Sequence, residues 1–185
     1  MKKHLRLFGS ALLLLLSGAC TQQPGTSAEY TPIPNTNERS QIIYLLDSFN
    51  NAAASADFEQ YFNCFAEEAV FIGTDATEYW TKEQFMIWAK PYFDQGKAWS
   101  FQSMERHIYF NQTGNTAWFD ELLNTQMSLC RGSGVLTKQN NVWKIQQYVL
   151  SMTIPNNATK EVVRLKGPFE EALINELVSK HGDKK

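Results

Sequence analysis

The sequence predicts an α+β domain in which helices come first and a long antiparallel sheet follows. From Thr116 to Pro155, three runs rich in β-branched and aromatic residues are separated by short polar or Gly-containing turns. Runs of this kind are typical of consecutive antiparallel strands. Ahead of them, apolar residues recur at helical spacing. At 185 residues and 43% hydrophobic composition, the chain is long enough for one domain with a sizeable core.

The region before the sheet contains three helix-start signals. In each, a side chain that can cap a helix is followed three residues later by Glu or Gln: Asn35 and Glu38, Asp57 and Gln60, Thr81 and Gln84. The first signal predicts a helix over about 37–55, the second a shorter helix, and the third a helix that Gly96 ends. Ala69–Ile72 is an apolar run too short for a helix, so we expect a strand there.

The sheet is expected to begin with a strand over Trp99–Phe110, followed by a hairpin turn at 111–115. Pairing Phe110 with Thr116 places Arg106 opposite Asp120, because antiparallel partners step in opposite directions.

In the next hairpin, a strand over Arg131–Thr137 returns through a turn at 139–141. Closing this turn at Lys138 and Val142 places Ser133 opposite Gln147. Side-chain alternation then puts one set of residues on one face and a second set on the other: Asp120, Arg131, Ser133, Gln147, Ser151, Trp143, Ile145 and Val149 against Glu121, Tyr148, Leu150 and Met152.

The N-terminal residues have the pattern of an export signal. Met1–Arg6 is basic, Leu12–Leu16 lies in a short apolar run, and Ser17–Cys20 places small residues before a cysteine. This pattern resembles the bacterial lipobox, which implies a signal peptide at 1–19, lipidation of Cys20 and a flexible tether at 20–35. We therefore expect an exported protein anchored to a bacterial membrane, on the periplasmic side or in the outer membrane, through this lipid only. The alternative is an ordinary cleaved signal peptide beside an unmodified cysteine.

Charge and cysteine content narrow the range of partners. Three of the 17 basic residues lie in the first 19 positions, which leaves 14 bases against 19 acids. No basic run follows, and this argues against a nucleic-acid partner. In an oxidising compartment Cys64 and Cys130 could pair, but their placement in a predicted helix and at a strand start favours two separately buried thiols.

Several segments taken together resemble the SnoaL-like branch of the nuclear transport factor 2-like superfamily. They are Phe71–Asp75 with Trp80, Ala117–Glu121, Arg131–Leu136, and Trp143–Ile145 leading to Leu150–Ser151. The resemblance covers 36–156 and leaves 157–185 as a tail, in which Gly167 and Pro168 open a short helix. It implies a cone-like, cystatin-like barrel, whose curved antiparallel sheet wraps around N-terminal helices, with a pocket at the wide end. It also implies a homodimer through the sheet.

The resemblance leaves catalysis open, because this fold hosts isomerases, dehydratases, cyclases and binding modules. Enzymes of the superfamily combine a carboxylate base with an oxyanion partner in an apolar cavity. The carboxylates in plausible positions are Asp75, Asp120 and Glu121, with Tyr148 or His107 as donors. For Asp120 the alternative is a salt bridge to Arg106 or Arg131.

The expected ligand-binding residues combine aromatic rings with polar groups of the sheet: Tyr79, Trp88, Tyr92, Asp120, Arg131, Gln147 and Tyr148. His107 lacks spaced partners, so no metal is expected, and no motif indicates a cofactor. Three hypotheses remain. The first is a domain that binds a small apolar or amphipathic molecule in an aromatic cavity, the second an enzyme with a cavity carboxylate, and the third a dimeric scaffold without ligand.

Overall fold

The computed structural model describes residues 36–182, so the predictions for Cys20 and the rest of 1–35 lie outside the described residues. The helices of this part are α1 (Thr36–Ala54), α2 (Phe58–Asn63), α3 (Lys82–Asp94) and α4 (Thr159–Gly182), with a 3-10 turn η1 at Asn156–Ala158. The strands are β1 (Phe65–Ile72), β2 (Tyr79–Thr81), β3 (Phe101–Phe110), β4 (Thr116–Thr125), β5 (Ser128–Gln139) and β6 (Val142–Met152). The predicted α+β class is confirmed.

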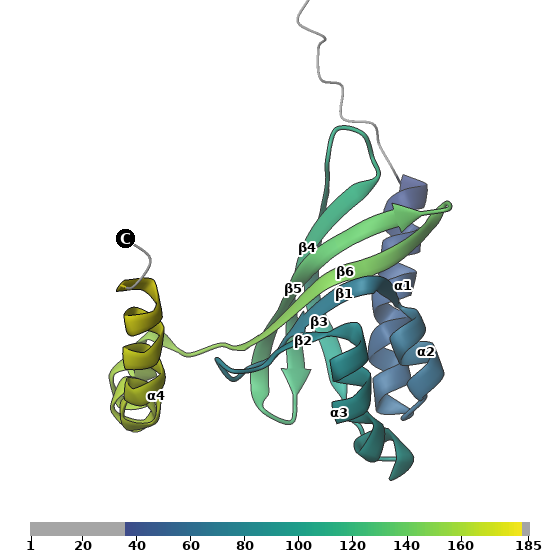
Figure 1. Ribbon diagram of the computed structural model, residues 1–185. Coiled ribbons are helices and arrows are strands. Elements are labelled where there is room, and N and C mark those ends of the chain that lie inside the picture. Colours follow the sequence, from purple (N-terminus) through teal and green to yellow (C-terminus); the bar gives the residue numbers. More distant parts are fainter. Residues whose placement is uncertain (1–35, 183–185) are drawn as a thin grey trace, which may run out of the picture. The chain divides into compact units, whose positions relative to one another are not determined.

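The six strands form one curved sheet in the order β2-β1-β6-β5-β4-β3. Neighbouring strands are antiparallel, except that β1 runs parallel to β6. The sheet is therefore mixed, because β1 comes from the helical half and joins the edge of the meander. Helices α1, α2 and α3 lie together on one face of it (Figure 1). Register shifts in the β1–β6, β3–β4 and β5–β6 pairs bend the strands around these helices.

Two of the three predicted helix starts are observed as caps. The Asp57 carboxylate accepts a hydrogen bond from the Gln60 amide, and Thr81 and Gln84 form a complete capping box. Glu38, of the first helix-start signal, contacts the sheet. Its carboxylate accepts hydrogen bonds from Lys138 Nζ at 2.7 Å and from Trp143 Nε1 at 2.6 Å. Glu38 therefore ties the first turn of α1 to the β5–β6 hairpin, about one hundred residues along the chain.

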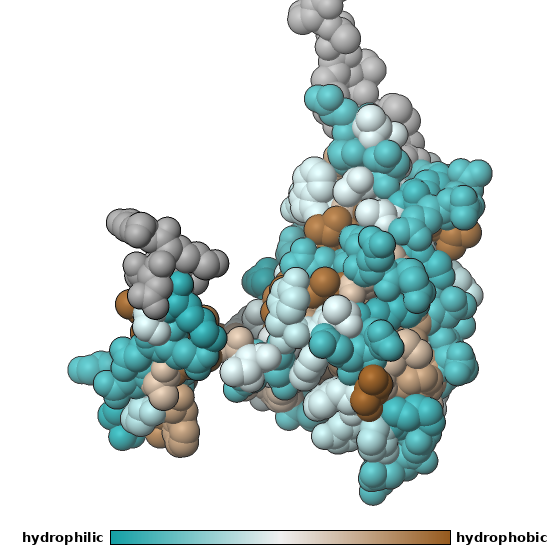
Figure 2. Space-filling view, in the orientation of Figure 1, coloured by the Kyte–Doolittle hydropathy of each residue, from teal (hydrophilic) through white to brown (hydrophobic). Residues whose placement is uncertain are grey.

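The core between helices and sheet is mainly aromatic. Phe49 of α1 stacks on Tyr61 of α2 at a centroid distance of 4.4 Å, and Phe71 of β1 stacks on Phe85 of α3 at 4.0 Å. Each such ring pair contributes about 0.5–1.5 kcal/mol beyond the apolar area that it buries. On the face drawn in Figure 2, hydrophilic side chains predominate and the apolar ones lie in separate patches.

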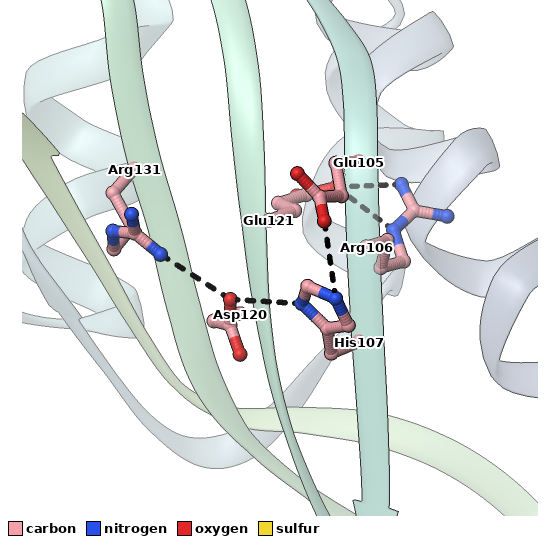
Figure 3. Close-up of polar contacts among 6 residues, drawn as sticks. All are labelled: Glu105, Arg106, His107, Asp120, Glu121 and Arg131. Carbon is pink, nitrogen blue, oxygen red and sulfur yellow. Dashed lines mark hydrogen bonds and ion pairs between the residues drawn. The ribbon is translucent and has the colours of Figure 1, made fainter.

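One layer of this core is charged. Glu121 of β4 is fully buried, and its Oε2 accepts from Arg106 Nε at 2.8 Å and lies 2.7 Å from Arg106 Nη2. The same guanidinium donates through Nη1 to Asp47 of α1 at 2.8 Å. Arg106 therefore connects the inner face of the sheet to α1. Figure 3 shows its contacts with Glu121.

The predicted pairing of β3 with β4 is wrong by one residue. Phe110 pairs with Ala117, so Arg106 lies opposite Glu121 and not opposite Asp120. The side-chain carbonyl of Asn111 accepts from the amides of Asn115 and Thr116, and the Asn111 amide donates to the Thr116 carbonyl, so Thr116 lies opposite Asn111 and not opposite Phe110. A one-residue slip exchanges the partners across the strands, which is why counting alone does not settle register.

The predicted pairing of β5 with β6 is also wrong. Gln139 pairs with Val142 across a tight turn in which Asn140 and Asn141 both have positive φ, and this geometry favours asparagine. A bulge near Gln146 then shifts the register, so that Ser133 lies opposite Val149. The bulge also changes the faces: Trp143 and Ile145 are buried on the inner side with Tyr148, and not with Val149.

The C-terminal helix is longer than predicted. It begins at Thr159 and continues through Gly167 and Pro168 to Gly182. Cys64 and Cys130 are free and buried, as favoured from the sequence. Among the described helices, none is long and apolar enough to cross a membrane.

Replacing Glu38 with Gln should lower the free energy of unfolding by about 1–2 kcal/mol at pH 7, because a charge-assisted contact with Lys138 is lost. Hydrogen bonds from Lys138 and Trp143 hold the pKa of Glu38 below its ordinary value of 4.5. A lowered pKa contributes stability that is present above the ordinary value and is lost as the pH falls through the folded-state value. The difference between wild type and variant in thermal unfolding should therefore shrink below pH 4.5. Glu161→Gln, which breaks an exposed ion pair with Arg164, is the control and should change little.

Replacing Arg106 with Met should destabilise the domain by about 3–5 kcal/mol, because the Glu121 carboxylate would remain buried without its counter-ion. The deficit should decrease as the pH falls and Glu121 becomes protonated. The double variant Arg106→Met/Glu121→Leu should recover most of the loss in chemical denaturation. A double variant as unstable as the single one would contradict the electrostatic explanation and point to packing.

Candidate functional site

A pocket of about 180 Å³ lies where the ends of several elements meet. Its wall is formed by the end of β1 and the turn after it, by β2 and α3, by the start of β3, by the β4–β5 turn and by Leu150 near the end of β6. Half of the lining residues are aromatic: Phe71, Trp80, Phe85, Trp88, Trp99 and Phe101. The pocket is thus located at the open end of the curved sheet, where the aromatic core meets solvent.

Local sequence sets the positions of these rings. The Thr81 cap fixes the start of α3, so that Phe85 is buried while Trp88, three residues later, remains 40% exposed. Trp80, just before the cap, stacks on Trp88 at 4.9 Å and on Phe85 at 5.5 Å. Trp99 completes the group, with its ring 5.8 Å from Phe85. The pocket therefore has a buried aromatic floor and a half-exposed aromatic rim.

The polar lining comes mainly from one turn. Thr74 and Glu78 line the pocket, and Gln126 adds an amide from the opposite side. Glu78 Oε2 accepts from the Asp75 amide at 3.2 Å, while Asp75 Oδ1 accepts from the amide and the hydroxyl of Thr77. The bonds from Thr77 lower the pKa of Asp75. The carboxylate of Asp75 thus organises the turn that presents Glu78.

Glu121 and Tyr148 form a second, deeper group. Tyr148 is the next inward-facing residue from Leu150 along β6, and it is fully buried. Its hydroxyl and Glu121 Oε1 have no hydrogen-bonding partner among the described residues. Burial raises the pKa of Glu121, and the charge and hydrogen bonds of Arg106 offset part of this rise. Gly132 leaves room for the phenol, since a Cβ there would lie 2.5 Å from the Tyr148 hydroxyl.

A third group of charges lies on the outer face of the sheet (Figure 3). Asp120 Oδ1 is 3.3 Å from Arg131 Nη1 and 3.3 Å from His107 Nδ1. The other ring nitrogen of His107 is 3.3 Å from Glu105. Asp120 alternates with the buried Phe119 and Glu121, so these side chains point away from the core. Asp120 is therefore paired with Arg131, one of the two partners considered from the sequence.

The site residues predicted from the sequence do not all lie in the pocket. Trp88 lines the pocket, and Tyr92 stacks on it at 5.0 Å while being 45% exposed. Tyr79 is 64% exposed and is not part of the lining.

The polar candidates are spread over three places. Asp120, Arg131 and Gln147 belong to the outer face, Glu121 and Tyr148 to the deeper layer, and Asp75 to the turn beside the pocket. In the described part of the chain, no group of three or more His, Cys, Asp or Glu side chains is arranged to hold a metal ion.

Sequence reasoning did not single out Glu78, Trp99 or Phe101 as pocket residues. The spacing of Trp80, Phe85 and Trp88 around the Thr81 cap was the available signal for an aromatic cluster. Glu78 carried no such signal, because its role depends on a turn that folds back over Gly73.

The fold and the family are supported by comparisons with known proteins. Residues 42–155 match the SnoaL-like domain family. A nuclear transport factor 2-like protein of unknown function from Pseudomonas putida has 13% identity, a TM-score of 0.57 and coverage of 65% of this chain and 90% of its own. A domain of unknown function with a cystatin-like fold from Nostoc punctiforme has 15% identity, a TM-score of 0.58 and coverage of 80% and 99%. A candidate dehydratase of the same fold family from Streptomyces avermitilis has 15% identity, a TM-score of 0.56 and coverage of 66% and 99%.

At these identities the solved structures establish the fold, and the predicted cystatin-like architecture is confirmed. No curated protein gives a significant match. The family match spans more than half of the chain and includes the sheet, its covering helices and the pocket. The chain therefore belongs to the SnoaL-like domain family.

Proposed function

We propose that this domain binds a small apolar or amphipathic molecule in the aromatic pocket at the open end of the sheet. The observation that carries the proposal is the pocket's lining, in which six aromatic rings surround a few polar groups. Concave sites of this composition are typical of small-molecule binding, where apolar walls supply affinity and polar groups supply orientation. Trp88, on the rim, remains accessible to a ligand from solvent.

The size of the pocket limits the ligand. Drug-sized molecules occupy sites of about 300–1,000 Å³, whereas a cavity of about 150 Å³ holds benzene. A volume of about 180 Å³ therefore suits a molecule, or an inserted group, of six to eight non-hydrogen atoms. Larger ligands would have to leave most of their surface outside.

We further propose that the protein acts outside the cytoplasm, anchored by a lipid on Cys20. The support is the basic, then apolar, then small-residue pattern of residues 1–20. A homodimer through the outer face of the sheet belongs to the same proposal. Tyr109 and Trp118 stack there at 5.9 Å, and Trp118 is 47% exposed, so an apolar surface is present for a second copy.

An enzyme is the second candidate function, and the deeper polar layer favours it. A buried carboxylate with a raised pKa beside an unpartnered phenol is the combination that proton-transfer sites use. Two facts weigh against it: neither Glu121 nor Tyr148 lines the pocket, and Arg106 already neutralises the carboxylate. Turnover of a bound molecule that disappears in Glu121→Gln while binding persists would favour the enzyme.

The binding proposal predicts that the full chain, purified in a maltoside detergent, shows a saturable change in tryptophan fluorescence on titration with cyclohexanol. Trp88→Leu should weaken this binding about tenfold, because it removes an aromatic wall of the pocket. Tyr44→Leu is the control, since its ring is exposed on α1 and does not line the pocket. Native mass spectrometry of the same preparation should detect a co-purifying small molecule. Absence of both a bound mass and a saturable change would refute the proposal.

The anchoring proposal predicts that Cys20→Ala moves the protein from the membrane fraction to the soluble fraction. Loss of the acyl chains removes about 0.8 kcal/mol of membrane affinity for each buried CH₂ group. Fractionation followed by immunoblotting measures the outcome, and Cys64→Ala serves as the control because this thiol is buried in the domain. Retention of the Cys20→Ala protein in the membrane fraction would count against lipidation.

A further inference from the structure

The charge on the pocket lining is negative. Of its twelve lining residues, Glu78 is acidic and none is basic. Three of the rings are tryptophans: Trp80, Trp88 and Trp99. An anionic ligand would meet a carboxylate and the negative faces of aromatic rings, so the lining disfavours anions. A cationic ligand would be attracted by both.

The aromatic composition of the lining suits a cation. A cation within about 6 Å of a ring centroid is attracted by the ring quadrupole, and tryptophan is the strongest partner. Trp80 is stacked on Trp88 at 4.9 Å, and Trp99 is 6.2 Å from Trp88, so the three tryptophans form one continuous aromatic wall. Elsewhere in residues 36–182, the cations over ring faces are Arg39 on Phe110 and Lys90 on Phe58. Neither of these rings belongs to the pocket.

Glu78 is held in place at the pocket wall. Its Oε2 accepts from the Asp75 amide, and Asp75 is in turn braced by Thr77. The carboxylate lies over Gly73, which also lines the pocket, because a Cβ on Gly73 would be 2.1 Å from Glu78 Oε2. Glycine at this position therefore leaves the space that the carboxylate occupies. A fixed negative charge beside aromatic faces complements a positive ligand at little cost in side-chain ordering.

From these observations we propose that the pocket binds a trimethylammonium group, as found in choline and in choline headgroups of lipids. A quaternary ammonium ion presents methyl groups to apolar walls and a positive charge to a carboxylate, and aromatic sites are its typical receptors. Choline has seven non-hydrogen atoms, which matches a volume of about 180 Å³. The inference rests on the proposed function, since it names the ligand class of the same pocket.

The test compares choline with its uncharged isostere 3,3-dimethylbutan-1-ol, in which carbon replaces the nitrogen, by isothermal titration of the full chain in maltoside detergent. Choline should bind at least about tenfold more tightly than the alcohol. Glu78→Gln should weaken choline binding several-fold and leave the alcohol unchanged. Gly73→Ala should do the same by displacing the Glu78 side chain, whereas Tyr44→Leu should bind both as wild type does.

The outcomes distinguish a preference for cations from the binding of small molecules in general. Equal affinity for choline and the alcohol, or an equal loss of both in Glu78→Gln, would overturn the cation preference while leaving a binding pocket. Binding of neither molecule would overturn the inference, and together with a negative cyclohexanol titration it would remove the proposed function as well. If choline binds, competition by phosphatidylcholine vesicles would identify the lipid headgroup as the source, and lack of competition would identify a free solute.

Discussion

The ion pair between Arg106 and Glu121, extended to Asp47, holds together the two halves of the domain. Glu121 is fully buried, so its charge is tolerated only while Arg106 remains 2.7–2.8 Å away. That contact requires the observed pairing of β3 with β4, because a shift by one residue would turn Glu121 to the outer face. Through Asp47, the same guanidinium sets where α1 crosses the sheet. The position of α1 then determines the space left for the aromatic core.

The pocket is present because the aromatic core is closed at one end and not at the other. Towards the β5–β6 hairpin the inner face is closed by Trp143, whose indole is bonded to Glu38 of α1. Towards the other end, Trp80, Trp88 and Trp99 pack beside Phe71 and Phe85 and remain partly exposed. A curved sheet that closes at one end leaves its interior accessible at the other. The site is thus a consequence of the sheet's curvature.

Three groups of charged residues on or beside the sheet lie in different surroundings. The inner layer of Arg106 and Glu121 is dry and structural, the outer cluster around Asp120 is solvated, and Glu78 alone brings a carboxylate to the pocket. Of the three, only Glu78 lines the pocket.

Much of the architecture followed from local signals in the sequence. The caps at Asp57 and Thr81, the apolar spacing of α1 and the alternation of β4 predicted the α+β class and most element positions, because each depends on neighbouring residues. The free, buried state of Cys64 and Cys130 also followed from their placement. For the site, the aromatic content predicted an aromatic cavity, and Trp88 was among the candidates that line it.

What the tertiary structure decided concerns contacts between distant segments. The partner of Arg106 depends on one residue of register, and the inward position of Trp143 depends on a bulge near Gln146, neither of which has a local signature. Glu78 entered the pocket because its turn folds over Gly73, while Asp120 and Arg131 were carried to the outer face. The sequence by itself determined which elements form, since hydrogen bonding and hydrophobic periodicity act over a few residues. The packing of those elements decided which side chains meet, since pairing across the sheet joins residues that no short-range pattern relates.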